Sequence, residues 1–234
     1  MSAIILFMAG VAAIAGWWLS QQRLAAKPWL EEGLTADLRE EGTPSLPAAK
    51  IGLGVFLAVV GSLFALFISA YSMRMNMVDW RTLPVPALLW FNTGILVVSS
   101  LALQWAHMAA RRDDIDGVTI GLCAGGASAI TFLVGQLLAW RELSAAGYFL
   151  ASNPANSFFY LITAVHGLHL MGGLVALGRT TAKVMRGAEA AQIRLSVDLC
   201  AIYWHFLLVV WLVLLGLLTG WTDGFVNICR QLLS

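Results

Sequence analysis

The sequence predicts an all-α membrane protein, a polytopic bundle of about six transmembrane helices. Of its 234 residues, 59% are hydrophobic and only 12% are charged, and the mean hydropathy is +0.79. A water-soluble domain of this length could not keep so much apolar surface out of water. Apolar runs of close to 20 residues recur along the chain, and each is long enough to cross a hydrocarbon layer of about 30 Å. The net charge of +1 gives no reason to expect a nucleic-acid partner.

The apolar runs define the predicted membrane spans and the division of the chain. The first span has no basic segment before it and is followed by Arg23 and Lys27, which is the reverse of the charge order in a cleaved signal peptide. We therefore expect an N-terminal transmembrane helix (1–22), a cytoplasmic linker (23–49) and a transmembrane domain of five helices (50–234). The six predicted spans are 3–20, 51–73, 86–106, 117–140, 156–179 and 198–220.

The linker contains a short segment with apolar residues at helical spacing. Trp29, Leu30, Leu34 and Leu38 alternate with acidic residues, and Pro28 suits a first helical position. A short helix on the membrane surface and an ordinary solvated loop explain this pattern equally well. Within the later spans, small residues recur at four-residue spacing, as in the pairs Gly121/Gly125 and Gly172/Ala176, which predicts close contacts between helices.

Basic residues are divided unevenly between the two predicted sides of the membrane. The connections after the first, third and fifth spans hold ten Lys and Arg residues, and the other side holds four. The positive-inside rule places the richer side in the cytoplasm and both termini on the outer, periplasmic side. The ten are Arg23, Lys27, Arg39, Lys50, Arg111, Arg112, Arg179, Lys183, Arg186 and Arg194, and the four are Arg74, Arg81, Arg141 and Arg230.

The ionisable residues in the middle of the spans are three histidines, His166, His169 and His205. Ion pumps and channels usually place an acidic or basic residue there, despite a cost of about 2.5–3.5 kcal/mol, so transport by this chain alone is not expected. At about 1.5 Å per residue, His169 and His205 lie at one depth if the last two spans are neighbours. We predict a structural polar cluster that hydrogen-bonds between helices. A metal site and a proton relay remain open alternatives.

Four stretches of the chain resemble the helices of cytochrome c oxidase subunit III, the third subunit of the haem–copper oxidases. They are IGLGVFLAVVGSLFALFISAYS (51–72), LPVPALLWFNTGILVVSSLALQWA (83–106), NSFFYLITAVHGLHLMGGL (156–174) and YWHFLLVVWLVL (203–214). The resemblance covers about residues 50–220. Each motif alone is weak, but the combination of HGLH, YWHF and NT…SS…LQWA is fairly specific.

The resemblance implies an accessory subunit of a respiratory terminal oxidase in the inner (plasma) membrane. In that family the subunit packs in a complex with catalytic subunit I and subunit II, where the haem and copper reside. It carries no catalytic residue, cofactor or metal of its own, supports proton uptake and stability, and binds phospholipid in a cleft between helices. Arg194, Arg179 and Lys183 are candidate ligands of a phospholipid headgroup, although ordinary positive-inside charge explains them as well.

Two positions depart from the family. Val60 stands where the family has Glu, and Leu208 stands where it has Asp, so two buried polar partners are missing. A buried carboxylate and its partner are often lost together, because one left alone is an unpaired charge. One helix and a long loop before a five-helix core are also unusual. Two alternatives stay open: the subunit III-like accessory protein of a nitric oxide reductase, and a stand-alone membrane protein that binds metal or haem with the three histidines.

Overall fold

The computed structural model describes residues 48–220, apart from Asn76, Thr82 and Glu189. Each of its five helices is long and apolar enough to cross a membrane, which confirms the prediction of an all-α membrane bundle. The predicted first span (3–20) and the segment 23–47 lie outside the described residues. The helices are α2 (Ala48–Arg74), α3 (Leu88–Arg111), α4 (Ile115–Ala145), α5 (Pro154–Met185) and α6 (Ala190–Leu218).

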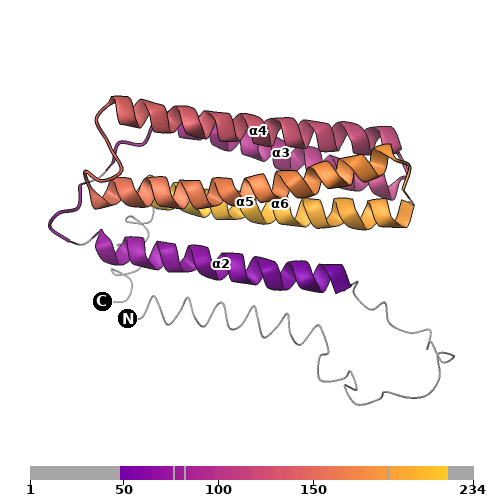
Figure 1. The fold of residues 1–234 in the computed structure, drawn as a ribbon, viewed down its shortest axis with the longest axis horizontal. Helices are drawn as coiled ribbons and strands as arrows, with labels where there is room; N and C mark the ends of the chain where they lie inside the picture. The colour runs from indigo at the N-terminus through magenta and orange to yellow at the C-terminus, as the bar shows by residue number, and fades with distance from the viewer. Residues whose placement is uncertain (1–47, 76, 82, 189, 221–234) are drawn as a thin grey trace, which may run out of the picture. The chain divides into compact units, whose positions relative to one another are not determined.

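The helices lie side by side, and consecutive helices run in opposite directions (Figure 1). α3 packs against α4 and α6, and α5 packs against the same two helices. α2 packs against α6 and α5. Since α6 contacts three other helices, its sequence decides much of the core, and Trp204, Leu207 and Trp211 on it are completely buried.

Two helices begin at polar caps that the hydropathy pattern does not reveal. Asp114 precedes α4, and its side chain accepts a hydrogen bond of 2.9 Å from the backbone N–H of Gly117. Asn153 caps α5 in the same way, with Pro154 at the first helical position. α4 and α5 end just before Gly147 and Gly187, whose φ values of 88° and 68° favour glycine. Both helices extend beyond the predicted spans, 117–140 and 156–179, at both ends.

Small residues allow α3 and α4 to approach closely. A Cβ atom added to Gly121 would lie 2.8 Å from the Cβ of Ala106 and 2.9 Å from the carbonyl oxygen of Ala102. Gly125 similarly meets Leu103. The predicted close contact at Gly121/Gly125 is thus confirmed. The prediction for Gly172 is wrong, because nothing lies within 4 Å of its added Cβ, and its neighbour Gly173 makes the helix contact instead.

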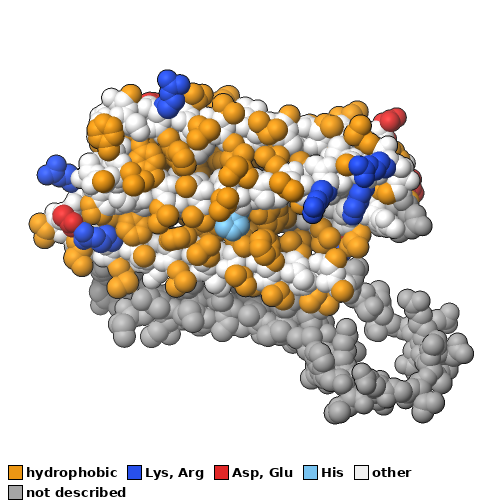
Figure 2. Space-filling model, in the orientation of Figure 1, with side chains coloured by type: hydrophobic (Ala, Val, Ile, Leu, Met, Phe, Trp, Pro, Cys, Tyr) orange, Lys and Arg blue, Asp and Glu red, His pale blue; other side chains and the backbone are white. Residues whose placement is uncertain are grey.

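The outer surface of the bundle has an apolar middle and charged ends. Figure 2 shows one face on which hydrophobic side chains predominate, whereas Lys, Arg, Asp and Glu side chains gather toward the two ends. This distribution is the one that a bilayer requires. The start of α2, the α3–α4 connection and the α5–α6 connection share one end (Figure 1), as the predicted topology demands.

Candidate functional site

The imidazole of His205 joins α6 to α3. Its Nε2 lies 2.9 Å from the Oε1 of Gln104, and its Nδ1 contacts the hydroxyl of Ser100. Gln104 and Ser100 lie one helical turn apart, so one face of α3 presents both groups to the ring. Because an amide oxygen can only accept, Nε2 carries the proton and Nδ1 accepts from the serine hydroxyl. This arrangement suits a neutral imidazole.

Two tryptophans of α6 make further polar contacts with α3. The indole N–H of Trp204 donates to the hydroxyl of Ser99 over 2.9 Å, and Ser99 in turn donates to the carbonyl of Gly125 on α4 over 2.7 Å. The indole N–H of Trp211 donates to the Thr93 hydroxyl over 2.9 Å. Sequence reasoning missed these partners. The signal was the spacing of seven between the tryptophans, which puts both on one face of α6.

His166 and His169 have different surroundings from His205. The Nδ1 of His169 bonds the carbonyl oxygen of Val165 on its own helix, at 2.8 Å. His166 is fully buried, and the centroid of its ring lies 5.1 Å from that of Trp211. The rings of Phe132 and Phe64 also contact it. Neither nitrogen of His166 has a hydrogen-bond partner in the described part of the chain. Among the described residues, no hydrogen bond joins any two of the three predicted histidines.

The polar side chains of Asn92 on α3 and Gln136 on α4 are also buried, and like His166 on α5 they have no hydrogen-bond partner among the residues that the structure describes. Asn92 packs directly against the backbone of Gly135, where an added Cβ would overlap its side chain. Gln136 follows Gly135 in the chain. Such groups are uncommon in folded proteins, because each one loses the hydrogen bonds that water would supply.

An acidic residue at one end of the bundle ties three helices together. Asp198 of α6 pairs with the ammonium group of Lys50 on α2, and its other oxygen lies 3.5 Å from the Nδ1 of His107 on α3. The Asp198 side chain is only 18% exposed, so the two partners offset much of its desolvation. Sequence reasoning found neither partner of Asp198.

The three candidate headgroup ligands are near the same end, where α5 stops and α6 begins. Arg194 binds Asp113 of the α3–α4 connection, with its Nη2 2.6 Å from both carboxylate oxygens. Lys183 donates to the hydroxyl of Ser196 over 3.3 Å. Arg179 is exposed and has no partner among the residues that the structure describes. The guanidinium of Arg194 is therefore already occupied, whereas Arg179 is available.

An apolar groove of about 290 Å³ runs between α2, α5 and α6. One wall of the groove is formed by small residues of α5, which carry little or no side chain: Gly172, Gly173 and Ala176. Phe56 and Tyr203 face it from the other two helices. Arg179 lies one helical turn beyond Ala176 on α5, so a cation follows the groove toward the end of the bundle.

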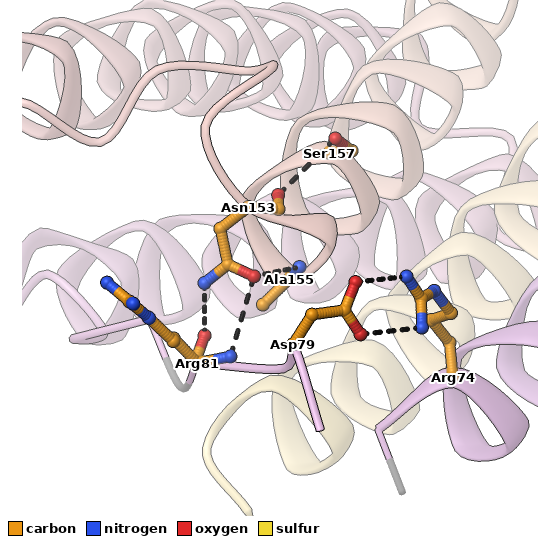
Figure 3. A network of polar contacts seen from close by, with 6 residues as sticks. All are labelled: Arg74, Asp79, Arg81, Asn153, Ala155 and Ser157. Atoms are coloured by element: carbon orange, nitrogen blue, oxygen red, sulfur yellow. Dashed lines mark hydrogen bonds and ion pairs between the residues drawn. The ribbon is translucent and has the colours of Figure 1, made fainter. Parts of the chain in front are cut away.

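The opposite end of the bundle is held by a polar network (Figure 3). The side chain of Asn153 donates to the carbonyl of Arg81 over 2.6 Å and accepts from the N–H of Ala155 over 3.2 Å. Arg74 pairs with Asp79 through both carboxylate oxygens. The Arg74 guanidinium holds the pKa of the Asp79 carboxyl below its usual value. The contact between Asn153 and Arg81 ties the α2–α3 connection to the start of α5, and the pair of Arg74 and Asp79 ties the same connection to the end of α2.

The two positions that depart from the family lie in apolar surroundings. Val60 is 3% exposed and packs with Phe64, Ile162 and Leu214. Leu208 is partly buried against the larger core that α3–α6 form. Apolar side chains thus fill both positions. Within residues 48–220, apart from the three gaps, no three His, Cys, Asp or Glu side chains come together to hold a metal ion.

Comparison with known proteins gives a consistent result. The sequence profile of the family described as cytochrome c oxidase subunit III matches residues 52–223. A cytochrome c oxidase subunit 3 from Thermostichus vulcanus is 33% identical over 176 residues, which are 72% of this chain and 85% of that protein. One from Synechocystis is 29% identical over 207 residues, covering 82% and 88%. A probable cytochrome c oxidase subunit 3 from Mycobacterium bovis is 36% identical over 127 residues, covering 52% and 60%.

Proposed function

The chain belongs to the cytochrome c oxidase subunit III family, and from this we propose that it is a cofactor-free accessory subunit of a respiratory haem–copper oxidase. The observation that carries the proposal is the family match over residues 52–223, which includes all five described helices except the first residues of α2. We expect aerobic electron transfer and proton pumping to occur in the partner subunits, and this chain to stabilise them.

The chemistry of the spans supports a role without redox centres. His169 and His205 bond different partners, His166 is buried among aromatic rings, and none of the three joins a metal-binding group of His, Cys, Asp or Glu among the described residues. The geometry therefore offers nothing in favour of the stand-alone metal or haem protein. The names of the three relatives favour an oxidase over a nitric oxide reductase.

We further propose that the groove between α2, α5 and α6 binds one acyl chain of a phospholipid. Its apolar lining and small residues suit a lipid tail, and Arg179 and Lys183 near its end suit the phosphate. Arg194 is a weaker candidate than the sequence indicates, because Asp113 already neutralises it. The finding that would contradict this proposal is unchanged phospholipid content after Arg179→Gln and Lys183→Gln together.

We also propose that Asp198 and His107 help to supply protons to the catalytic subunit. They lie at the end of the bundle that we propose to be cytoplasmic, and both side chains remain partly accessible. A carboxylate beside an imidazole can accept a proton from water and pass it on. Asp198→Asn in the assembled oxidase should slow turnover at high pH, where protons are scarce, more than at low pH.

The main proposal is tested by purifying the tagged full chain from its native membrane. A haem-containing catalytic subunit should accompany it in a fixed ratio, and a second subunit of the oxidase should be present. The haem bands in the visible spectrum should belong to that partner and disappear from the chain when the subunits are separated. Haem or stoichiometric metal retained by the isolated chain would refute the accessory role.

A further inference from the structure

One stripe of α6 remains uncovered by the other described helices. Residues 198, 202, 205, 209 and 212 recur at intervals of three and four, so they lie along one side of the helix. α2 and α3 both pack against α6, yet Ile202, Val209 and Leu212 are 38%, 59% and 46% exposed. Asp198, which contacts both flanking helices, marks one end of this stripe.

Polar side chains are concentrated on this stripe and on the neighbouring edge of α3. We call Gln104, His107, Asp198 and His205 the α3/α6 polar face. His205 lies halfway between Gln192 and Leu218, the ends of the membrane-spanning part of α6, and it is only partly buried. Both nitrogens of His205 are paired within the chain, but the amide N–H groups of Gln104 beside it would meet hydrocarbon if lipid covered this face, and polar groups at the membrane midplane are costly.

The outer faces of α2, α4 and α5 suit lipid much better. Their large exposed side chains in the membrane include Val59, Leu66, Val134, Leu137, Leu168 and Val175. Exposed hydroxyls on these helices, such as those of Ser62 and Thr131, donate to carbonyls of their own helix. His169 on α5 also uses its Nδ1 in this way. The α3/α6 polar face differs because it presents hydrogen-bond donors that its own helices do not use.

Hydrogen-bond donors on and beside the α3/α6 polar face indicate which chemical groups a partner would need to present there. The Oε1 of Gln104 accepts from His205, which leaves the two N–H groups of the amide without a partner among the described residues. The ammonium group of Lys50 has three N–H donors, and within the described residues the carboxylate of Asp198 is its single partner. A complementary surface must therefore present acceptors, which means carbonyl, hydroxyl or carboxylate oxygens.

We propose that the α3/α6 polar face is the docking surface for a transmembrane helix of the oxidase's catalytic subunit, and that this helix presents hydrogen-bond acceptors to Gln104. The inference rests on the proposed function, since it assumes that the complex forms. Polar contacts between helices hold membrane subunits together where lipid gives no hydrophobic drive to associate.

Two other occupants fit the donors poorly. A second copy of the chain in a symmetric dimer would offer Gln104 only side-chain acceptors that are already engaged on this face, because the Oε1 of Gln104 accepts from His205 and the carboxylate of Asp198 pairs with Lys50. In the predicted N-terminal span (3–20) the one side-chain oxygen is the hydroxyl of Ser20 at its end, so this span would bring no oxygen acceptor to the membrane midplane, where Gln104 lies beside His205. Neither occupant would satisfy the amide of Gln104.

Site-specific photo-crosslinking in the intact oxidase complex tests the proposal. p-Benzoylphenylalanine replaces Val209, which lies one turn from His205 on the uncovered stripe of α6, and in matched controls it replaces Val134 on α4 or Leu168 on α5. All three positions are at least half exposed, so the probe leaves the core contacts in place. After illumination of native membranes, the adducts are identified by mass spectrometry. The Val209 probe should give the catalytic subunit as its main adduct, at least ten times more than either control.

Several outcomes would overturn the inference. They are a Val209 adduct with lipid only, with a second copy of the chain or with its residues 1–45, and a preferential adduct of the catalytic subunit at Val134 or Leu168. In each of these cases, copurification of the haem-containing subunit would leave the proposed function standing. Absence of that subunit from the purified complex would instead refute the proposed function, and the docking inference with it.

Discussion

Replacing Gly173 by alanine should destabilise the bundle, whereas the same replacement at its neighbour Gly172 should not. The two glycines are adjacent in α5, but they face different surroundings. A Cβ atom at position 173 would lie 2.7 Å from Cε1 of Tyr203 and 2.8 Å from Cζ3 of Trp204. Nothing lies within 4 Å of a Cβ at position 172. The pair therefore isolates one helix contact.

The two aromatic rings cannot move aside cheaply. The hydroxyl of Tyr203 donates to the carbonyl of His169 over 2.8 Å. Trp204 is completely buried, and its indole N–H is held by Ser99. Overpacking of this kind costs about 1–3 kcal/mol. Both variants gain about 1 kcal/mol of helix propensity, and this gain cancels when they are compared. The Gly173→Ala protein should thus be about 1–3 kcal/mol less stable than the Gly172→Ala protein.

The assay is thermal unfolding of the purified full chain in detergent, followed by circular dichroism and by tryptophan fluorescence. For a chain of this length, about 1–3 kcal/mol corresponds to a difference in Tm of roughly 2–12 °C. The Gly172→Ala protein serves as the matched control and should melt at or above the Tm of the unmodified chain. Equal melting of the two variants would refute the close packing of α5 against α6 at this point.

Three further changes test other contacts. Val60→Glu should lower stability by about 2.5–3.5 kcal/mol, because its neighbours Phe64, Ile162 and Leu214 offer no partner for a carboxylate, and thermal unfolding measures this loss. His205→Leu should cost about 0.6–1.7 kcal/mol for each hydrogen bond lost, whereas His205→Gln should retain part of it, and neither change should remove a haem band from the assembled oxidase. Asp79→Asn should lower Tm above pH 3.8 but not at a pH well below it. The pKa of Asp79 is lower in the folded protein than the usual 3.8, so its pair with Arg74 contributes fully above pH 3.8 and is lost as the pH falls through the lower, folded pKa. In a pH series of melting curves, the Tm values of the variant and the unmodified chain should therefore converge at low pH.

The sequence predicted the five described helices because apolar length is a local property. A segment in lipid must satisfy its backbone hydrogen bonds within itself, so a long apolar run becomes a helix whatever its neighbours are. The ends were less well predicted. Asp114 and Asn153 set where α4 and α5 begin through side-chain caps, and capping depends on backbone geometry rather than on hydropathy.

The environment of each histidine was beyond sequence reasoning. His205 bonds residues that are 105 and 101 positions away, and nothing in the local pattern identifies Ser100 and Gln104 as its partners. His166 and His169 lie one turn apart and both contact Phe64, but His166 also meets Phe132 and Trp211, because the rotation of α5 turns His166 into the core and leaves His169 at its edge. The pairing of Arg194 with Asp113 was missed for the same reason.

By itself the sequence determined that this chain crosses the membrane repeatedly, that its basic residues favour one side and that its motifs are those of subunit III. These properties depend on the order and type of residues along each helix. The tertiary structure alone decided which helices meet at α6, which glycine makes a contact and which polar groups lack a partner. Such features depend on the rotation and neighbours of each helix, and these are fixed by packing between segments that are far apart in the chain.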